Sequence, residues 1–437
     1  MTRTAATMFL ALGSAAVLLA ADPCPAQSYT MTEIPMSSPG PINNNGQIGG
    51  AAPTTGDPSG NDPYILSSDG TLTDLGNLGS SCDVYGCRAV ALNSLGDAVG
   101  HAGTTPGSYK PFLFSNGKIS QLQPDSANPL GLNTGGTIVG YFYPIACAPI
   151  ETTHAFVIQN GVFTDLSQPT DPSQPCNIYS QATGINTSGQ IAGFATDPSN
   201  TVAPYIASVW QADGTISFLG ILGTGSFSRA FAINDAGLVT GASDTGDAQG
   251  SEHAFLFSNG QMTDIDTLGS LVSRGLSINK NGVVVGMAAA PNQTGIFYRA
   301  FVFMGGSMMD LNTLIPSGSG LTLLYANGIN DAGEIVGDAQ SNSDGTVRGF
   351  LLKPVAPQIA AISPASGKAG TLVTITGKNF TKKPAACNVT FNGKPAKWTK
   401  WTTTQVQVQV PAAATTGKVV LSAFFQKSNS KTFTVTK

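Results

Sequence analysis

AINDAGLVTG, residues 232–241, is the stretch that decides the fold, because its Asn-x-x-Gly-x-x-x-Gly spacing recurs along most of the chain. Seven copies occur at intervals of 40 to 53 residues, and each keeps both glycines. Their asparagines are Asn43, Asn93, Asn133, Asn186, Asn234, Asn279 and Asn330. Repeats with periods of roughly 20–50 residues are typical of solenoids and propellers.

Each copy is followed by an apolar, usually aromatic segment such as Phe255-Leu256-Phe257, and in most copies then by an Asn-Gly turn and a short strand. One repeat therefore predicts four antiparallel strands in about 48 residues, the content of one propeller blade. The asparagine is expected to open a tight hairpin, and a glycine to supply its positive φ angle. We interpret the seven asparagines as structural residues rather than as ligands that ring a pore.

The two ends of the repeat region complement each other. The seventh aromatic segment, residues 349–352, has no fourth strand after it, whereas residues 29–34 (YTMTEI) match the fourth-strand pattern. A strand from the N-terminal end that completes the last blade would remove the exposed sheet edges. The sequence thus predicts an all-β protein with a seven-bladed β-propeller over residues 28–354, closed by an N-terminal strand.

The composition agrees with short strands joined by turns. Only 11 % of the 437 residues are charged, 52 are glycine and 41 % are hydrophobic. Long exposed helices, coiled coils and classical disorder all need more charge than this.

A different module follows the repeats. Residues 362–367 (ISPASG) lead into 370–380 (GTLVTITGKNF), and Val406, Val408 and Val410 alternate with glutamine, so that one strand face is buried. These residues resemble the IPT/TIG immunoglobulin-like domain, which implies a β-sandwich over residues 355–437. Such modules occur in proteins of many kinds, so the fold does not fix the function.

Residues 253–257 (HAFLF) and 232–237 (AINDAG) resemble the HAF extracellular repeats of bacterial exported proteins. The resemblance implies an exported repeat protein and little chemistry. We interpret His154 and His253, which both precede Ala-Phe, as residues that serve blade packing.

The first 26 residues have the layout of a signal peptide. Arg3 precedes an apolar run from Met8 to Ala21, which is too short to span a bilayer core of about 30 Å. No later stretch is long enough to be a transmembrane segment. We expect cleavage after Ala21 or Ala26 and a secreted or surface-associated protein without a lipid anchor.

Export to an oxidising compartment favours disulfides. We expect one pair between Cys82 and Cys87, which share a loop, and one between Cys147 and Cys176, which flank a strand pair. A zinc site is the weaker interpretation of these four residues, because no CxxC pair or nearby histidine completes a ligand set. Cys387 is expected to be a small buried hydrophobic residue.

The formal net charge of −4 is the sum of two parts of the chain with opposite charge. Residues 355–437 hold eleven lysines and no acidic residue, a net of +11, so the remainder carries −15. The lysines either keep strand edges from pairing, or dock the module on an anionic cell-surface polymer or on the acidic propeller. We expect no nucleic-acid partner.

Signatures of catalysis are absent from the sequence. It has only three histidines and no Gly-x-Ser-x-Gly, His-Glu-x-x-His or phosphate-binding glycine loop, so we expect no cofactor and no enzymatic activity. Loop carboxylates remain candidates for paired action, at Asp57, Asp62, Asp244, Asp247, Glu252 and Asp344. Asp244, Asp247 and Glu252 are weak calcium candidates, because their spacing lacks a full EF-hand pattern and suits a solvated loop.

Three classes of function remain open. The loops between the second and third strands and those between repeats are long and emerge on one face, which we call the long-loop face. We expect an exported scaffold or adhesion protein that binds a glycan or a protein on this face and docks through its basic C-terminal module. The alternatives are a carbohydrate-active or lactonase-like propeller enzyme that uses loop carboxylates, and a structural surface or matrix component.

Overall fold

The computed structural model describes most of the chain from residue 29 onward. The described ranges are 29–36, 38–54, 57–80, 82–83, 86–105, 108–147, 152–167, 176, 178–199, 204–247, 249–289, 298–380, 387–423 and 426–437. The predicted signal peptide, residues 1–26, lies outside them. No helix among these residues is long and apolar enough to cross a membrane.

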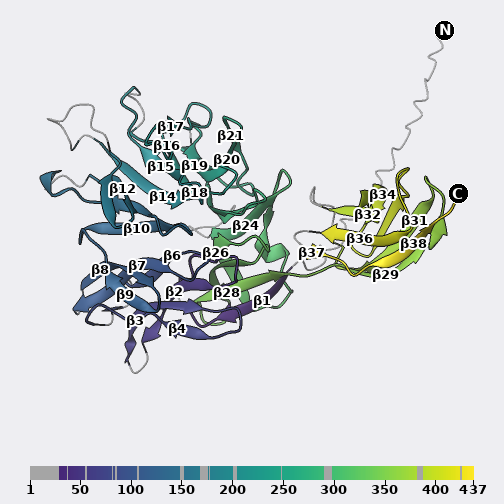
Figure 1. The fold of residues 1–437 in the computed structure, drawn as a ribbon, viewed down its shortest axis with the longest axis horizontal. Helices are drawn as coiled ribbons and strands as arrows, with labels where there is room; N and C mark the ends of the chain where they lie inside the picture. Colours follow the sequence, from purple (N-terminus) through teal and green to yellow (C-terminus); the bar gives the residue numbers. More distant parts are fainter. Residues whose placement is uncertain are drawn as a thin grey trace, which may run out of the picture.

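The repeat region consists of seven four-stranded antiparallel sheets (Figure 1). The second to sixth sheets each hold four strands in sequence order: β6 (Arg88–Leu92), β7 (Ala98–Thr105), β8 (Ser108–Ser115) and β9 (Lys118–Gln121); β10 (Ala127–Leu132), β11 (Ile138–Phe142), β12 (His154–Gln159) and β13 (Val162–Asp165); β14 (Ser180–Ile185), β15 (Ile191–Ala195), β16 (Ile206–Trp210) and β17 (Ile216–Phe218); β18 (Ser228–Ile233), β19 (Val239–Asp244), β20 (Glu252–Ser258) and β21 (Gln261–Asp264); β22 (Ser273–Ile278), β23 (Val284–Ala289), β24 (Tyr298–Met304) and β25 (Ser307–Asp310). Short 3-10 turns lie at η1 (Ile145–Cys147) and η3 (Leu311–Thr313).

The first and last sheets depart from this order. The first holds β2 (Ile48–Thr54), β3 (Asp57–Leu66), β4 (Leu72–Asp74) and β5 (Cys82–Asp83). The seventh holds β26 (Leu321–Ile329), β27 (Ile335–Ser341), β28 (Val347–Pro354) and, as its outer strand, β1 (Tyr29–Ile34). β1 pairs antiparallel with β28 from Tyr29 opposite Pro354 to Ile34 opposite Gly349, so the N-terminal strand joins the last sheet, as the sequence predicts (Figure 1).

The repeat asparagines form a closed circuit of hydrogen bonds. The Nδ2 amide of each one donates to the backbone carbonyl oxygen of the asparagine in the next repeat, at 2.8–3.2 Å. Asn330 of the seventh repeat donates in the same way to Asn43 of the first, at 3.2 Å. The Oδ1 atom caps the turn of its own repeat, as in Asn279, where it accepts from the N–H groups of Asn281 and Val283.

The two glycines of the motif do different work. The first takes a positive φ angle in every copy, for example 76° at Gly237. The second has no room for a side chain, because a Cβ atom at Gly241 would collide with the backbone carbonyl oxygen of Arg229 on the preceding strand. That strand bulges between Ala230 and Ala232, and this crowding at the bulge is what requires glycine.

The aromatic segments pack between the sheets. Phenylalanine side chains opposite the second glycine are fully buried in five repeats: Phe112, Phe156, Phe255, Phe301 and Phe350. In the fourth repeat this position holds Ser208, and the buried Trp210 lies two residues later. Burial of such rings contributes about 1.5–3 kcal/mol each to stability.

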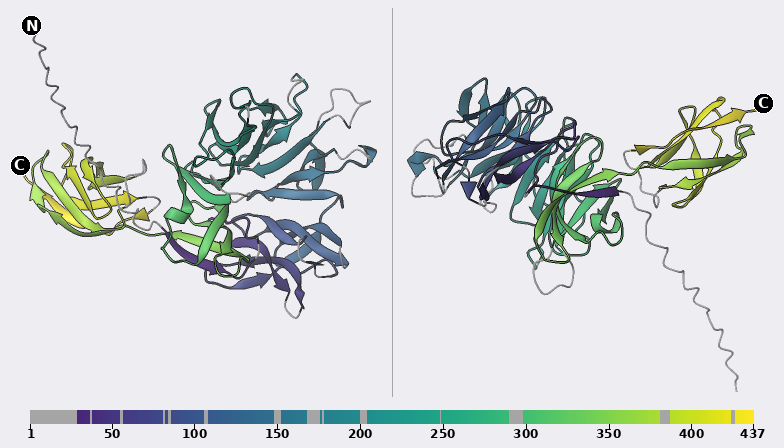
Figure 2. Two further views of the ribbon diagram at one scale, coloured as in Figure 1. Left: turned by 180° about the vertical axis from the view of Figure 1, so that it is seen from behind. Right: turned by 90° about the horizontal axis from the view of Figure 1, so that it is seen from below.

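The C-terminal strands form a β-sandwich joined to the repeat region between β28 and β29 (Figure 2). One sheet holds β29 (Gln358–Ser363), β31 (Leu372–Lys378), β35 (Gln405–Gln409) and β34 (Lys397–Trp401). The other holds β30 (Ser366–Gly367), β38 (Lys431–Val435), β36 (Gly417–Ala423), β32 (Asn388–Phe391), β33 (Lys394–Pro395) and β37 (Gln426–Lys427). Val406 and Val408 are fully buried between the sheets, which accounts for the alternation in the sequence.

Two disulfides, Cys82–Cys87 and Cys147–Cys176, lie at the end of the sheets opposite the asparagine turns. Cys387 is half-buried against the core of the sandwich.

Replacing one asparagine of the circuit should destabilise the repeat region markedly. Asn279→Ala removes the bond to Asn330 and leaves the N–H groups of Asn281 and Val283 without their acceptor, at a site only 3 % exposed. We expect the free energy of unfolding to fall by about 2–4 kcal/mol in urea denaturation.

Asn281→Ala is the matched control, because its exposed side chain lies in the same turn and makes no hydrogen bond within the described residues. It should change stability by less than about 0.5 kcal/mol. Equal effects of the two substitutions would contradict a structural role for the circuit.

Candidate functional site

One position of the repeat is occupied by a polar side chain in most repeats. It lies at the long-loop end of the sheets, which is the end opposite the Asn-x-x-Gly turns. This position lies five residues before each repeat asparagine. In five repeats it is the first or second residue of the sheet's first strand, and in the seventh repeat it is the middle of β26. In six repeats it pairs with the residue that follows the second glycine. Its occupants there are Arg88, Asn128, Gln181, Arg229, Arg274 and Tyr325.

The fold itself places these residues. The backbone carbonyl oxygen that crowds the second glycine belongs to this position in all six repeats. Glycine at this place lets the first strand of each sheet approach and bulge. The motif that stabilises the turns on one side therefore organises the side chains on the other.

Tyrosines gather at the same end. Seven of the ten tyrosines lie at strand ends or loops on the long-loop side: Tyr109, Tyr141, Tyr143, Tyr179, Tyr205, Tyr298 and Tyr325. Tyr109 and Tyr143 are 51 % and 48 % exposed. An exposed tyrosine offers a flat apolar face and a hydroxyl with little loss of side-chain entropy on binding, which suits it to contact a ligand.

Ring contacts connect these tyrosines from one sheet to the next. The ring centroids of Tyr179 and Tyr205 lie 5.7 Å apart, and Phe194 lies within 5.9 Å of both. Tyr205 in turn lies 5.7 Å from Phe227 of the following repeat. On the other flank, the rings of Tyr298 and Tyr325 are 5.2 Å apart.

Two arginines, on the first strands of the fifth and sixth sheets, share one buried carboxylate. Arg229 and Arg274 contact the two oxygens of Glu252 at 2.8 and 2.6 Å, and Glu252 is only 7 % exposed. The Arg229 guanidinium also lies over the rings of Tyr205 and Phe227, at 5.9 and 5.5 Å from their centroids. Because both guanidinium groups pair with Glu252, these two arginines link neighbouring repeats.

Arg88 differs from them. It is exposed, and alone among the five arginines in the described part of the chain it pairs with no carboxylate. It interacts electrostatically with Asp338, whose pKa burial raises while Asn327 and Arg88 oppose the shift. One Asp338 oxygen accepts from Asn327 at 2.9 Å, and the other is buried without a hydrogen bond.

His101 lies beside Arg88 on the paired strand. Its ring meets Tyr109 edge to face at 5.3 Å and contacts Asn128 and the backbone of Ala127. Burial, reinforced by Arg88, lowers the pKa of His101 to about 4, so the ring is neutral at pH 7.

We call this group of side chains, several of which are joined by ring contacts, ion pairs and hydrogen bonds, the tyrosine–arginine belt. Its members are Arg88, His101, Tyr109, Asn128, Tyr141, Tyr143, Tyr179, Gln181, Phe194, Tyr205, Phe227, Arg229, Glu252, Arg274, Tyr298, Tyr325 and Asp338. Its polar groups are only partly used, since the hydroxyls of Tyr109, Tyr205, Tyr298 and Tyr325 make no hydrogen bond within the described residues.

The opposite end is also polar, and its asparagine amides are bonded within the protein. A hollow of 320 Å³ is lined there by the repeat asparagines and the residues that flank them. Both polar atoms of each asparagine amide are already bonded, and flanking residues such as Asn44 and Asp331 bond to each other at 2.8 Å. These bonds agree with a structural role for the asparagines.

The structure does not assemble the predicted calcium candidates into a site. Asp244 accepts from the backbone and hydroxyl of Ser226, and Asp247 accepts from the backbone of Ser251, bonds that lower the pKa of both carboxyls. Glu252 is held by two arginines. In the described ranges no group of three or more His, Cys, Asp or Glu side chains is placed to hold a metal ion.

The other predicted carboxylates do not meet either. The side chain of Asp57 lies outside the described residues, and Asp62 is 1 % exposed. Asp344 accepts from the hydroxyl and N–H of Thr346 and from Arg348, and these bonds hold the pKa of Asp344 well below its usual range.

Two of the three histidines are cross-strand partners of aspartates. His154 lies 2.9 Å from Asp165, and His253 lies 2.7 Å from Asp264, each pair joining the third and fourth strands of its sheet. Their repetition in equivalent places agrees with the predicted packing role.

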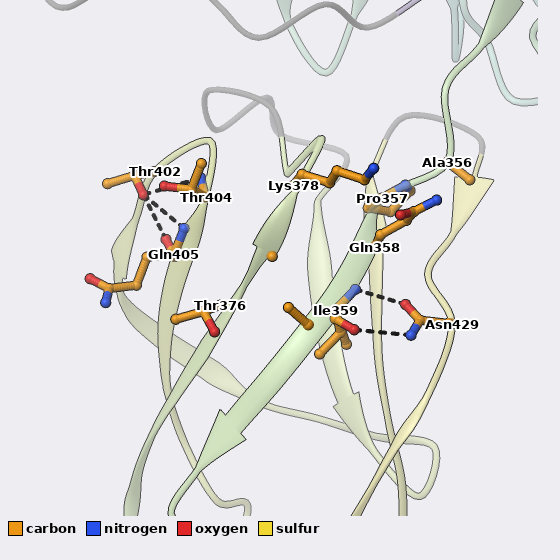
Figure 3. A pocket seen from close by; sticks show the side chains of 12 residues that line it. Ala356, Pro357, Gln358, Ile359, Thr376, Lys378, Thr402, Thr404, Gln405 and Asn429 are labelled. Carbon is orange, nitrogen blue, oxygen red and sulfur yellow. Dashed lines mark hydrogen bonds between the residues drawn. The ribbon is translucent and has the colours of Figure 1, made fainter.

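The sandwich carries a second hollow, of 980 Å³, at the end that faces the join with β28 (Figure 3). On its wall, the Asn429 side chain bonds to both the N–H and the carbonyl of Ile359, at 2.7 and 3.0 Å. Lys378 lies at its rim (Figure 3). None of the nine sandwich lysines in the described ranges forms an ion pair.

The fold and the belt define an all-β, multi-sheet protein with an immunoglobulin-like C-terminal module. Residues 357–435 match the model of the IPT/TIG domain family, so this module is an IPT/TIG domain. Residues 154–351 match a family described as a protein of unknown function (DUF3466), and that domain is present in the repeat region. No curated protein matches the chain.

Solved structures resemble the chain weakly. An acylaminoacyl peptidase from Pyrococcus horikoshii is 9 % identical, with 81 % of this chain and 58 % of that chain covered and a TM-score of 0.45. A fungal alcohol oxidase in complex with copper is 11 % identical, with 94 % and 100 % covered and a TM-score of 0.38. A putative phosphatase from Bacteroides thetaiotaomicron is 23 % identical, with 19 % and 18 % covered and a TM-score of 0.17. The chain spans less than two thirds of the peptidase and of the phosphatase, and none of these similarities supports an argument about function.

The belt was missed from sequence, although a signal for it was present. Counting back five residues from each repeat asparagine gives polar or charged side chains in all seven repeats, beginning with Ser38. The tyrosines do not occur at a fixed spacing from the repeat asparagines. They come from different strands and loops, and they lie near one another only in the folded protein.

The buried His101 should make stability depend on pH. The unfolded chain takes up the His101 proton near pH 6.5, whereas the folded chain takes it up only near pH 4. Stability is therefore full above pH 6.5 and falls as the pH drops from 6.5 to 4. In His101→Gln this contribution is absent, so the stability advantage of the wild type should shrink across that interval in urea denaturation. A constant difference between the two proteins from pH 7 to 4 would contradict this.

Proposed function

We propose that the protein is an exported, non-enzymatic binding protein built on a seven-bladed β-propeller that its N-terminal strand closes. Seven four-stranded sheets, the pairing of β1 with β28 and the circuit from Asn330 back to Asn43 support this architecture. The signal-peptide pattern and the resemblance to HAF repeats support export.

The ligand, a glycan or a protein, binds at the tyrosine–arginine belt. The observation that carries this proposal is the contrast between the two ends of the repeat region. Among the described residues, the amides of the repeat asparagines are fully bonded at one end, whereas the belt at the other end presents half-exposed tyrosines, hydroxyls without a hydrogen bond and one guanidinium without an ion pair. Residues that stay exposed and unsatisfied without contributing to packing are typical of binding surfaces.

The lysine-rich IPT/TIG domain serves docking or anchoring to an anionic surface polymer. Its charge of +11 comes without a single acidic residue, and its edge strand β34 exposes Lys397 and Lys400. Such attraction weakens with added salt.

Belt substitutions should abolish ligand binding while distant ones should not. In a screen of glycans and extracellular proteins, the full-length protein should bind saturably, and Tyr109→Ala combined with Tyr143→Ala should weaken binding at least tenfold. Leu95→Ala is the control, because Leu95 is 74 % exposed in an asparagine turn at the opposite end. Unchanged binding by the tyrosine variant, or turnover of a bound glycan, would overturn the proposal.

A further inference from the structure

Resting on the proposed function, we infer that the belt recognises a glycan bearing a carboxylate sugar, with the carboxylate bound by Arg88 and neighbouring sugar faces stacked on Tyr109 and Tyr143. This names the class of ligand for which the exposed groups of the belt are suited.

Arg88 is the available anion-binding group. Four of the five arginines in the described ranges are occupied by Glu252, Asp310, Glu33 and Asp344, and only Arg88 retains a free guanidinium. A guanidinium presents a planar pair of donors that matches both oxygens of a carboxylate. Asp338, with which Arg88 interacts electrostatically, accepts a hydrogen bond from Asn327 and forms no ion pair with Arg88.

The exposed tyrosines of the belt supply the apolar part of recognition. The Tyr109 ring contacts His101, which lies opposite Arg88 on the paired strand, and the rings of Tyr141 and Tyr143 lie 5.9 Å apart. The faces of pyranose rings are lined by C–H groups that pack on aromatic rings, while their hydroxyls need donors and acceptors such as the tyrosine hydroxyls. Flat rings, free hydroxyls and amides within one belt match a sugar chain.

Charge limits how anionic this glycan can be. The repeat region and signal peptide together carry a net charge of −15, so a densely charged polyanion would be repelled from this part of the chain. One free guanidinium suits one carboxylate among neutral contacts. Uronic-acid oligosaccharides meet this description better than sulfated glycans or acidic peptides do.

Carboxyl reduction provides the direct test. Hexasaccharides of polygalacturonate, alginate and hyaluronan, each native and carboxyl-reduced, are titrated calorimetrically into the full-length protein. We expect at least one native form to bind 10- to 100-fold more tightly than its reduced form, as charge-assisted hydrogen bonds imply. Arg88→Gln should remove that preference while keeping the residual affinity for the reduced form, and Tyr143→Ala should weaken both forms.

Lys118→Gln is the control for charge, because Lys118 is exposed next to an Asn-Gly turn at the opposite end of the sheets. It should leave both affinities unchanged. Equal binding of native and reduced forms, or an Arg88→Gln variant that keeps the preference, would overturn the inference and leave the proposed binding function standing. Preference for polyglutamate over every hexasaccharide would also overturn it. Absence of all binding to the hexasaccharides together with a negative screen would overturn both.

Discussion

Seven hydrogen bonds between asparagines are the constraint on which the rest of the repeat region depends. Each Asn side-chain amide makes hydrogen bonds on both sides. Its oxygen accepts from backbone N–H groups in the turn of its own repeat, and its nitrogen donates to the backbone carbonyl of the asparagine in the next repeat. The seventh bond, from Asn330 to Asn43, spans 287 positions of sequence and returns the circuit to its start. Burial makes an unpaired amide or carbonyl costly, so every repeat depends on its neighbours for satisfaction.

The same motif couples stability to the surface that we propose to be functional. Glycine at the second motif position lets the innermost strand bulge, and the carbonyl it accommodates belongs to the residue that contributes to the tyrosine–arginine belt. The turn side is therefore uniform and self-satisfied, whereas the long-loop side varies from repeat to repeat: arginine at 88, 229 and 274, amides at 128 and 181, tyrosine at 325. Variation on a fixed frame is how repeat architectures acquire specific sites.

Much of the frame could be predicted from the sequence, because it rests on local chemistry. The Asn-x-x-Gly turns, the aromatic strands and the pairing of residues 29–34 with the last sheet follow from hairpin propensity and strand counting. The site could not be predicted in the same way. Glu252 looked like a solvated loop acid, yet it is buried between Arg229 and Arg274 of two different repeats, and no local pattern states that contact. The free guanidinium of Arg88 became visible only once the partners of the other arginines were known.

Hydrogen exchange measured by mass spectrometry tests the central claim, that the seven repeats form one closed unit, most directly. If the circuit closes, amides of the innermost strands of all seven sheets should exchange through a common global opening, and β1 should be as protected as β28, its partner in the last sheet. An open array would instead lose protection from its ends inward, as expected for solenoids. Earlier exchange of the first and seventh repeats than of the middle ones would contradict the closed circuit.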